Sequence, residues 1–155
     1  MAERVAAAIA LGSNLGDRRA HLDYAVRRLS EFLRDLRVSS YIDTEPVGLP
    51  PAAPPFLNAA AVGETTLSPR ALLDALLDIE RARGRERPFV NAPRTLDLDL
   101  VLFGDAVVEE PGLTVPHPRF RGRRFVLEPL AEIAPDWIDP VTGKTVAELL
   151  RLVLP

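Results

Sequence analysis

Two aspartates interrupt an apolar run in "NAPRTLDLDLVLFGD", residues 91–105. Side chains alternate along a strand, so Asp97 and Asp99 are expected on one face. That alternation also predicts an acidic face continued by Val101 and Phe103, and a core face of Leu96, Leu98, Leu100 and Leu102. Carboxylates roughly 7 Å apart repel by about 2 kcal/mol at an effective dielectric of about 20. A divalent cation would turn that repulsion into joint ligation, and Mg²⁺ prefers oxygen ligands. The simpler alternative is a strand with one solvated end.

Arginines flank the acidic strand on both sides. The upstream set is Arg81, Arg83, Arg85, Arg87 and Arg94, and the downstream set is Arg119, Arg121, Arg123 and Arg124, close to His117. Arginine stays charged and binds phosphate oxygens through paired N–H groups. Carboxylates for Mg²⁺ and arginines for oxyanions are the groups that transfer of a phosphoryl-type group from a nucleotide requires. The alternative, solvated arginine-rich loops, is expected above all for Arg81, Arg83, Arg119 and Arg121.

Two familiar nucleotide-binding motifs are absent from the sequence. The stretch "ALGSNLGDR" has glycines after an apolar run, but no Gly-Lys-Ser/Thr follows, which excludes a P-loop. The dinucleotide pattern G-x-G-x-x-G is absent as well. We therefore interpret this stretch as a tight turn that ends a strand and leads into the first helix.

The elements that must position these residues follow from periodicity and capping signals. Strands are expected at 4–11, 37–44 and 56–65 and around Asp97 and Asp99, with a short strand near Val107 and Val108. Helices are expected after Asp17 with the stripe Leu22, Ala25, Val26, Leu29 and Leu33, from Ser68 and Pro69 to Gly84, over 125–134, and after the capping box of Thr145 and Glu148. Because strands and helices do not alternate regularly, we expect an α+β fold with helices on a largely antiparallel sheet.

Composition limits the class of protein. The 155 residues suit one domain over 1–155. A net charge of −3, with Lys144 as the only lysine, argues against bulk nucleic-acid binding. The absence of Cys excludes disulfides, and no apolar run approaches the ~20 residues that span a bilayer. Glu3 argues against a signal peptide. A cytoplasmic monomer without membrane or nucleic-acid partners is expected.

Seven stretches occur in an informative order: "ALGSNLGDR", "TEPVG", "PFLNAA", "IERARGRER", "APRTLDLDLVLFG", "VPHP" and "RRFVLEPLAEIAPD". Through them nearly the whole chain resembles the 6-hydroxymethyl-7,8-dihydropterin pyrophosphokinase family of folate biosynthesis. The resemblance implies a ferredoxin-like fold and transfer of pyrophosphate from ATP to the hydroxymethyl oxygen of the pterin, which yields AMP and the pterin pyrophosphate. It also implies two Mg²⁺ ions that bridge the ATP phosphates with Asp97 and Asp99.

The resemblance implies a role for individual residues as well. The expected catalytic residues are Arg85, Arg94, Asp97 and Asp99. The expected ATP contacts are Glu80, Arg85, Arg87, Arg94, Leu100, Thr114, His117 and Arg123. The expected pterin contacts are Thr44, Val47, Phe56, Asn58, Asp97 and Phe125, where Phe56 and Phe125 sandwich the ring and Asn58 bonds its edge. The chain departs from many relatives at Asn91, where they have an aromatic residue, and at Pro118.

Two rival functions remain open at this stage. A ferredoxin-like RNA-binding module would stack Phe on bases and place Arg on phosphates, although the acidic net charge argues against it. An aldolase-like pterin enzyme of the same pathway would need a base, for which the sequence offers no clear candidate. Pterin-dependent release of AMP from ATP separates these alternatives.

Overall fold

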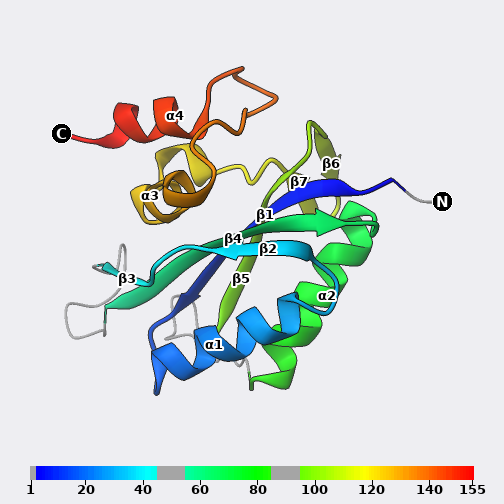
Figure 1. The fold of residues 1–155 in the computed structure, drawn as a ribbon, viewed down its shortest axis with the longest axis vertical. Helices are drawn as coiled ribbons and strands as arrows, with labels where there is room; N and C mark the ends of the chain where they lie inside the picture. The colour runs from blue at the N-terminus through cyan, green and yellow to red at the C-terminus, as the bar shows by residue number, and fades with distance from the viewer. Residues whose placement is uncertain (1–2, 45–54, 85–94) are drawn as a thin grey trace.

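A five-stranded antiparallel sheet separates two layers of helices in the computed structural model, which describes residues 3–44, 55–84 and 95–155 (Figure 1). The chain runs β1 (Val5–Ser13), α1 (Arg18–Leu29), β2 (Arg34–Val38), β3 (Ile42–Thr44), β4 (Phe56–Thr65), α2 (Pro69–Ala82) and β5 (Asp97–Phe103). The strand order is β2-β4-β1-β5, and β3 also pairs with β4. All these pairs are antiparallel. This confirms the predicted α+β, ferredoxin-like fold.

The second half of the chain adds a hairpin and the second helical layer. These elements are β6 (Val108–Glu110), β7 (Leu113–Val115), the short 3-10 helix η1 (Phe120–Gly122), α3 (Arg124–Ile133) and α4 (Val146–Val153). Figure 1 shows α1 and α2 on one face of the sheet and α3 and α4 on the other. In the described residues, no helix is long and apolar enough to cross a membrane.

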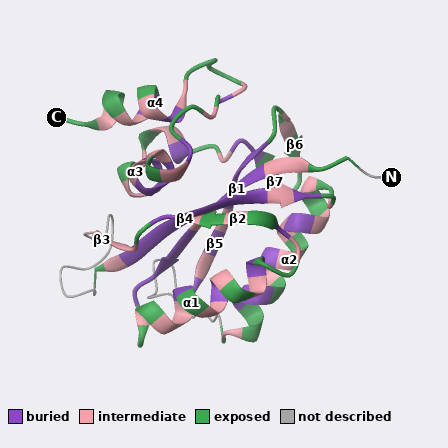
Figure 2. Cartoon of the chain, in the orientation of Figure 1, coloured by how far each residue is buried: buried purple, intermediate pink, exposed green. Residues whose placement is uncertain are grey.

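Each face of the sheet carries its own apolar core, and Figure 2 shows β1 and β4 largely buried between them. The first core, called the α1/α2 core below, joins Ile9 and Leu11 of β1 to Leu22 of α1 and Leu76 of α2. The second core, called the α3/α4 core below, contains residues of the sheet, η1, α3 and α4, among them Ala8, Val62, Phe120, Leu127, Leu130 and Leu149. Neighbouring residues of β1 enter opposite cores because side chains alternate along a strand.

The predicted helix starts are confirmed by their caps. Asp17 Oδ1 accepts a hydrogen bond from Ala20 N at 3.1 Å, and Ser68 Oγ accepts one from Ala71 N at 3.1 Å. Thr145 and Glu148 form the reciprocal capping box that was expected before α4. These side chains satisfy backbone N–H groups that have no partner within the first helical turn.

Three predicted boundaries are wrong. The strand expected at 37–44 is two strands, because Ser39 Oγ accepts from Ala60 N at 2.9 Å where a ladder carbonyl would otherwise bond. Strand β1 continues through Gly12 and Ser13 instead of breaking before them. Helix α1 ends at Leu29, so Leu33 lies in the turn that follows, although its side chain is buried as expected.

A β-bulge corrects the face assignment in β5. Ile9 pairs with Leu100 whereas the preceding Ala8 pairs with Leu102, which leaves Val101 as the extra residue on β5. Leu102 therefore enters the α3/α4 core and Phe103 the α1/α2 core, the reverse of strict alternation. Asp97 and Asp99 precede the bulge and keep the common face that was predicted.

Candidate active site

A row of polar side chains crosses three strands on the face that α3 covers. Gly12 of β1 pairs with Asp97 of β5 on one side and with Asn58 of β4 on the other. One pair further along, Ala10 lies between Asp99 and an alanine of β4. Directly opposed residues of paired strands project to the same face, so small residues of β1 separate the carboxylates from the amide.

The pterin contacts that were predicted in β3 and β4 lie beside one another. Asn58 is buried, and its Nδ2 donates a hydrogen bond to Thr44 Oγ1. Thr44 pairs with Phe56 across the β3–β4 ladder. A Cβ at Gly12 would lie 3.0 Å from Asn58 Oδ1 and 3.6 Å from Phe56 Cδ1, which shows how closely the three residues approach. The structure thus brings Thr44, Phe56 and Asn58 together, next to the acidic row.

Basic and aromatic side chains come from the segment that leads into α3. The Arg123 Cζ lies 5.5 Å from the centre of the Phe125 ring. His117 is tied to β5 because its backbone N–H donates to Val101 O at 2.9 Å. Burial lowers the pKa of His117, the charges of Arg123 and Arg119 lower it further, and Asp97 opposes them. His117 is therefore anchored to β5, the strand that carries the carboxylate row.

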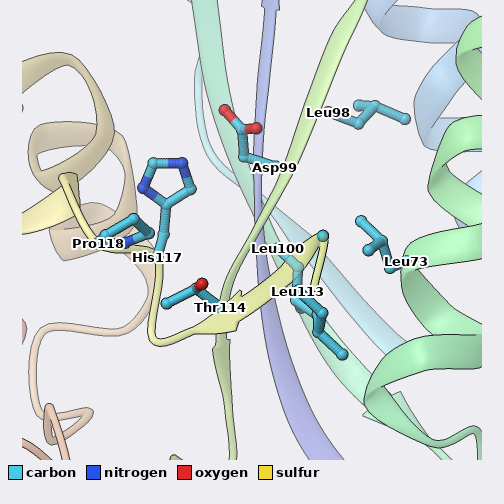
Figure 3. Close-up of a pocket in the computed structure, with 9 residues that line it drawn as sticks. Leu73, Leu98, Asp99, Leu100, Leu113, Thr114, His117 and Pro118 are labelled. Carbon is cyan, nitrogen blue, oxygen red and sulfur yellow. The ribbon is translucent and has the colours of Figure 1, made fainter. Parts of the chain in front are cut away.

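A cavity of about 280 Å³ opens at the acidic strand (Figure 3). Four predicted site residues line it: Asp99, Leu100, Thr114 and His117. Figure 3 shows Asp99 on β5 with the His117 ring nearby, and Thr114 on β7. Asp99, one of the two predicted metal ligands, thus shares a cavity with three predicted ATP contacts.

The sequence reasoning missed four residues that line this cavity, namely Leu73, Leu98, Gly112 and Leu113, whereas it had named Pro118 as a departure from the relatives. Two of them come from the β6–β7 hairpin, where only one short strand near Val107 and Val108 was expected. Gly112, with φ of +76°, makes the turn, and a Pro-Gly pair before "LTV" is the signal that predicts such a hairpin. Arg70 of α2 holds the turn by donating to Pro111 O at 3.0 Å.

Glu80 lies beneath the acidic strand on the opposite face. It is 2% exposed, and its Oε2 accepts a hydrogen bond from Leu98 N at 2.7 Å. Leu98 stands between Asp97 and Asp99, so this bond fixes the backbone that spaces the two carboxylates. The contact of Glu80 with ATP stays a prediction.

Some predicted site residues lie outside the described residues. They are Val47 in the segment 45–54 and Arg85, Arg87 and Arg94 in the segment 85–94, which also contains Asn91. Their roles stay predictions from the sequence.

The carboxylate pair suits Mg²⁺. In the described ranges no cluster of three or more His, Cys, Asp or Glu side chains forms a candidate metal site. Mg²⁺ usually takes one or two protein carboxylates and completes its octahedral shell with water and substrate phosphates. Asp97 and Asp99, on one face at the start of β5, match that donor set.

The fold and the site together define an α+β domain of the ferredoxin-like type with a carboxylate pair on one strand, where Asp99 shares a cavity with His117. Such a carboxylate pair suits nucleotide-dependent group transfer. The family model of 7,8-dihydro-6-hydroxymethylpterin-pyrophosphokinase (HPPK) matches residues 8–135. This chain belongs to that family.

Individual relatives agree with this assignment. The 2-amino-4-hydroxy-6-hydroxymethyldihydropteridine pyrophosphokinase of Synechocystis is 42% identical over 149 residues, which cover 95% of this chain and 75% of that protein. The protein of the same name from Pseudomonas aeruginosa is 44% identical over 145 residues, 92% of this chain and 88% of the relative.

Solved structures share the fold at lower identity. The structure of wild-type Plasmodium falciparum HPPK-DHPS superposes with a TM-score of 0.78 at 14% identity. The match covers 98% of this chain and 45% of that one, so this chain spans less than half of the Plasmodium chain. At this identity the likeness shows the fold alone.

Proposed function

We infer that this chain transfers pyrophosphate from ATP to the hydroxymethyl group of 6-hydroxymethyl-7,8-dihydropterin, a step of folate biosynthesis that releases AMP and the pterin pyrophosphate. The observation that carries this function most directly is the row across the sheet, where Asp97 lies across Gly12 from Asn58. A metal-binding carboxylate thereby adjoins the amide that would hold the pterin. Family membership over residues 8–135 supports the same reaction.

ATP occupies the cavity at β5 in this proposal. Leu100 and Thr114 supply its walls and His117 adjoins the phosphates. Arg123 adds a positive charge on the same side of the sheet, and the proposal completes the phosphate contacts with Arg85, Arg87 and Arg94. An anionic triphosphate gains most from such charge where the surrounding apolar groups exclude water.

The pterin lies along β4 in this proposal. Phe56 and Phe125 stack on its two faces, because a flat heteroaromatic ring gains from contact with two aromatic rings. Asn58 both donates to and accepts from the pterin edge. Its bond to Thr44 fixes the orientation of the amide before the substrate arrives. Thr44 and Val47 add largely backbone contacts.

Asp97 and Asp99 would hold two Mg²⁺ ions, which would neutralise charge on the ATP phosphate oxygens. The pterin hydroxyl oxygen attacks the β-phosphorus in line, the bond from that phosphorus to the AMP oxygen breaks, and the hydroxyl proton is released to water. No side chain of the described residues stands out as an obligatory general base. Catalysis then rests mainly on positioning and electrostatics. We propose that the enzyme acts as a monomer in the cytoplasm.

The test is pterin-dependent AMP release by Asp97→Asn and Asp99→Asn variants. Each should lower kcat by on the order of 100-fold or more, because a group that stabilises charge in the transition state is lost. The melting temperature should change little. Asp105→Asn is the matched control, since Asp105 is an exposed acid just beyond the same strand. Near-normal turnover in either β5 variant would contradict the assignment.

A further inference from the structure

Asp139, in the loop between α3 and α4, is a fully buried carboxylate. Arg121 donates to both of its oxygens, through Nε and through Nη2, the latter at 2.9 Å. Val141 N at 3.0 Å and Thr142 Oγ1 at 2.7 Å donate as well. Burial alone would raise the pKa of Asp139, but these donors outweigh it and lower the pKa to about 2. The ion pair is therefore charged at neutral pH.

Arg121 belongs to η1, in the middle of the segment that supplies three site residues. His117 stands four positions before it, Arg123 two positions after it, and Phe125 four positions after it. The neighbouring Phe120 is fully buried in the α3/α4 core, and the Arg121 guanidinium lies over its ring at 5.0 Å. The path of this segment thus determines where the basic and aromatic groups face the sheet.

The start of α3 has no side-chain cap to fix it. Its N-cap residue is Arg123, which makes no capping hydrogen bond with its side chain. The first end of the segment is held to β5 by the bond from His117 N to Val101 O. In the middle of the segment, the pair of Arg121 and Asp139 joins η1 to the α3–α4 loop. Asp139 O also accepts from Gly143 N at 2.8 Å within that loop.

We propose that Arg121 and Asp139 are positioning residues, whose ion pair fixes the 117–125 segment so that Arg123 meets ATP and Phe125 meets the pterin. This inference rests on the proposed function of those two residues. A buried ion pair often contributes little net stability compared with apolar residues of similar shape. The bidentate hydrogen bonds between the guanidinium and the carboxylate instead fix the relative orientation of the two side chains, which a single point charge does not.

Arg121→Lys tests the proposal, because it keeps the charge and most of the stem but loses the planar fork. Asp139→Asn and Arg121→Met are companion variants. The affinity for MgATP is measured without turnover by calorimetry with a non-hydrolysable ATP analogue, and kcat and KM for both substrates come from AMP release. We expect Kd and both KM values to rise on the order of tenfold, because small misplacements of contact groups weaken binding sharply.

Arg124→Met is the matched control. It removes an exposed arginine whose ion pair with Glu128, at 2.8 Å, stays within α3. Its Kd and KM values should stay within about twofold of the wild type. Arg121→Lys tests the pair even where the stronger variants fail to fold. A lowered melting temperature with unchanged Kd and KM values would overturn the proposal. A wild-type chain without pterin-dependent AMP release would contradict the proposed function instead, and the ATP analogue would still test the ion pair.

Discussion

The imidazole of His21 acts as a hydrogen-bond acceptor at the junction of α1 and α2. Arg83 Nε donates to His21 Nδ1 at 2.8 Å, and the Arg83 guanidinium also lies over the Tyr24 ring at 4.7 Å. Burial lowers the pKa of His21 most, the charge of Arg83 lowers it further, and Asp17 opposes both. Because a protonated Nδ1 cannot accept, this contact requires neutral histidine.

Acidification should therefore weaken the fold through His21. The pKa of His21 in the folded state lies below 6.5, so the unfolded chain takes up the proton first as the pH falls. Stability is lost as the pH falls below 6.5 toward the folded-state pKa. Between pH 7.5 and 5.5, the melting temperature of the wild type should fall further than that of a His21→Asn variant. His117 titrates in both proteins and cancels from the difference. Parallel pH profiles would contradict this role.

Two arginines show what sequence cannot reveal at this scale. Solvated loops were expected to contain Arg83 and Arg121, and that prediction is wrong for both. Arg83 meets His21 across 62 positions of sequence, and Arg121 meets Asp139 across 18. The prediction weighed each arginine only against its neighbours in the chain, whereas both partners come from elements that tertiary packing brings close. The pairing of Asp97 with Asp99 could be predicted from the sequence because both residues lie in one strand.

Gly12 of β1 separates Asp97 from Asn58, the amide that we propose binds the pterin. At Gly12→Ala, the new Cβ would lie 3.0 Å from Asn58 Oδ1, and the bond to Thr44 limits how far the amide can move away. We expect KM for the pterin to rise on the order of tenfold, because overpacking that costs about 1.4 kcal/mol weakens binding by that factor. Kd for MgATP should change much less. The measurement is steady-state kinetics combined with ATP-analogue titration.

Gly122→Ala provides the control for this variant. A Cβ at Gly122 would meet no atom within 4 Å, and the residue does not have a positive φ. Its KM for the pterin should stay near the wild-type value. An equal loss of ATP and pterin binding in Gly12→Ala would indicate general distortion of β1 instead of a local effect on Asn58.

Elements were predictable where local chemistry sets them. Caps at Asp17, Ser68 and Thr145 determine helix starts by hydrogen bonds within four residues, and all three were predicted correctly. The bulge at Val101 was not predictable, because strand pairing creates it and the apolar pattern of β5 continues on both sides. Ser39 broke the second strand for a similar reason, since its hydroxyl bonds to β4, a strand 21 positions away.

In the part of the chain that the structure describes, two apolar cores lie on opposite faces of the five-stranded sheet. Neighbouring residues of β1, such as Ala8 and Ile9, belong to different cores, so the sheet couples the two helical layers. Trp137 is the only tryptophan of the chain and packs against the α3/α4 core. Its fluorescence therefore reports on one layer, whereas far-UV circular dichroism reports on both.

If residues 1–155 form the single domain that the sequence predicts, a substitution that destabilises one core must also lower the unfolding midpoint of the other. Leu76 is fully buried in the α1/α2 core, and Leu76→Ala should cost about 2–5 kcal/mol. The Trp137 fluorescence midpoint in urea should then fall together with the circular-dichroism midpoint. Leu152→Ala, at a side chain that is 69% exposed, should leave both midpoints nearly unchanged. A Trp137 transition that keeps its wild-type midpoint while circular dichroism unfolds in two steps would show that the two layers are separate cooperative units.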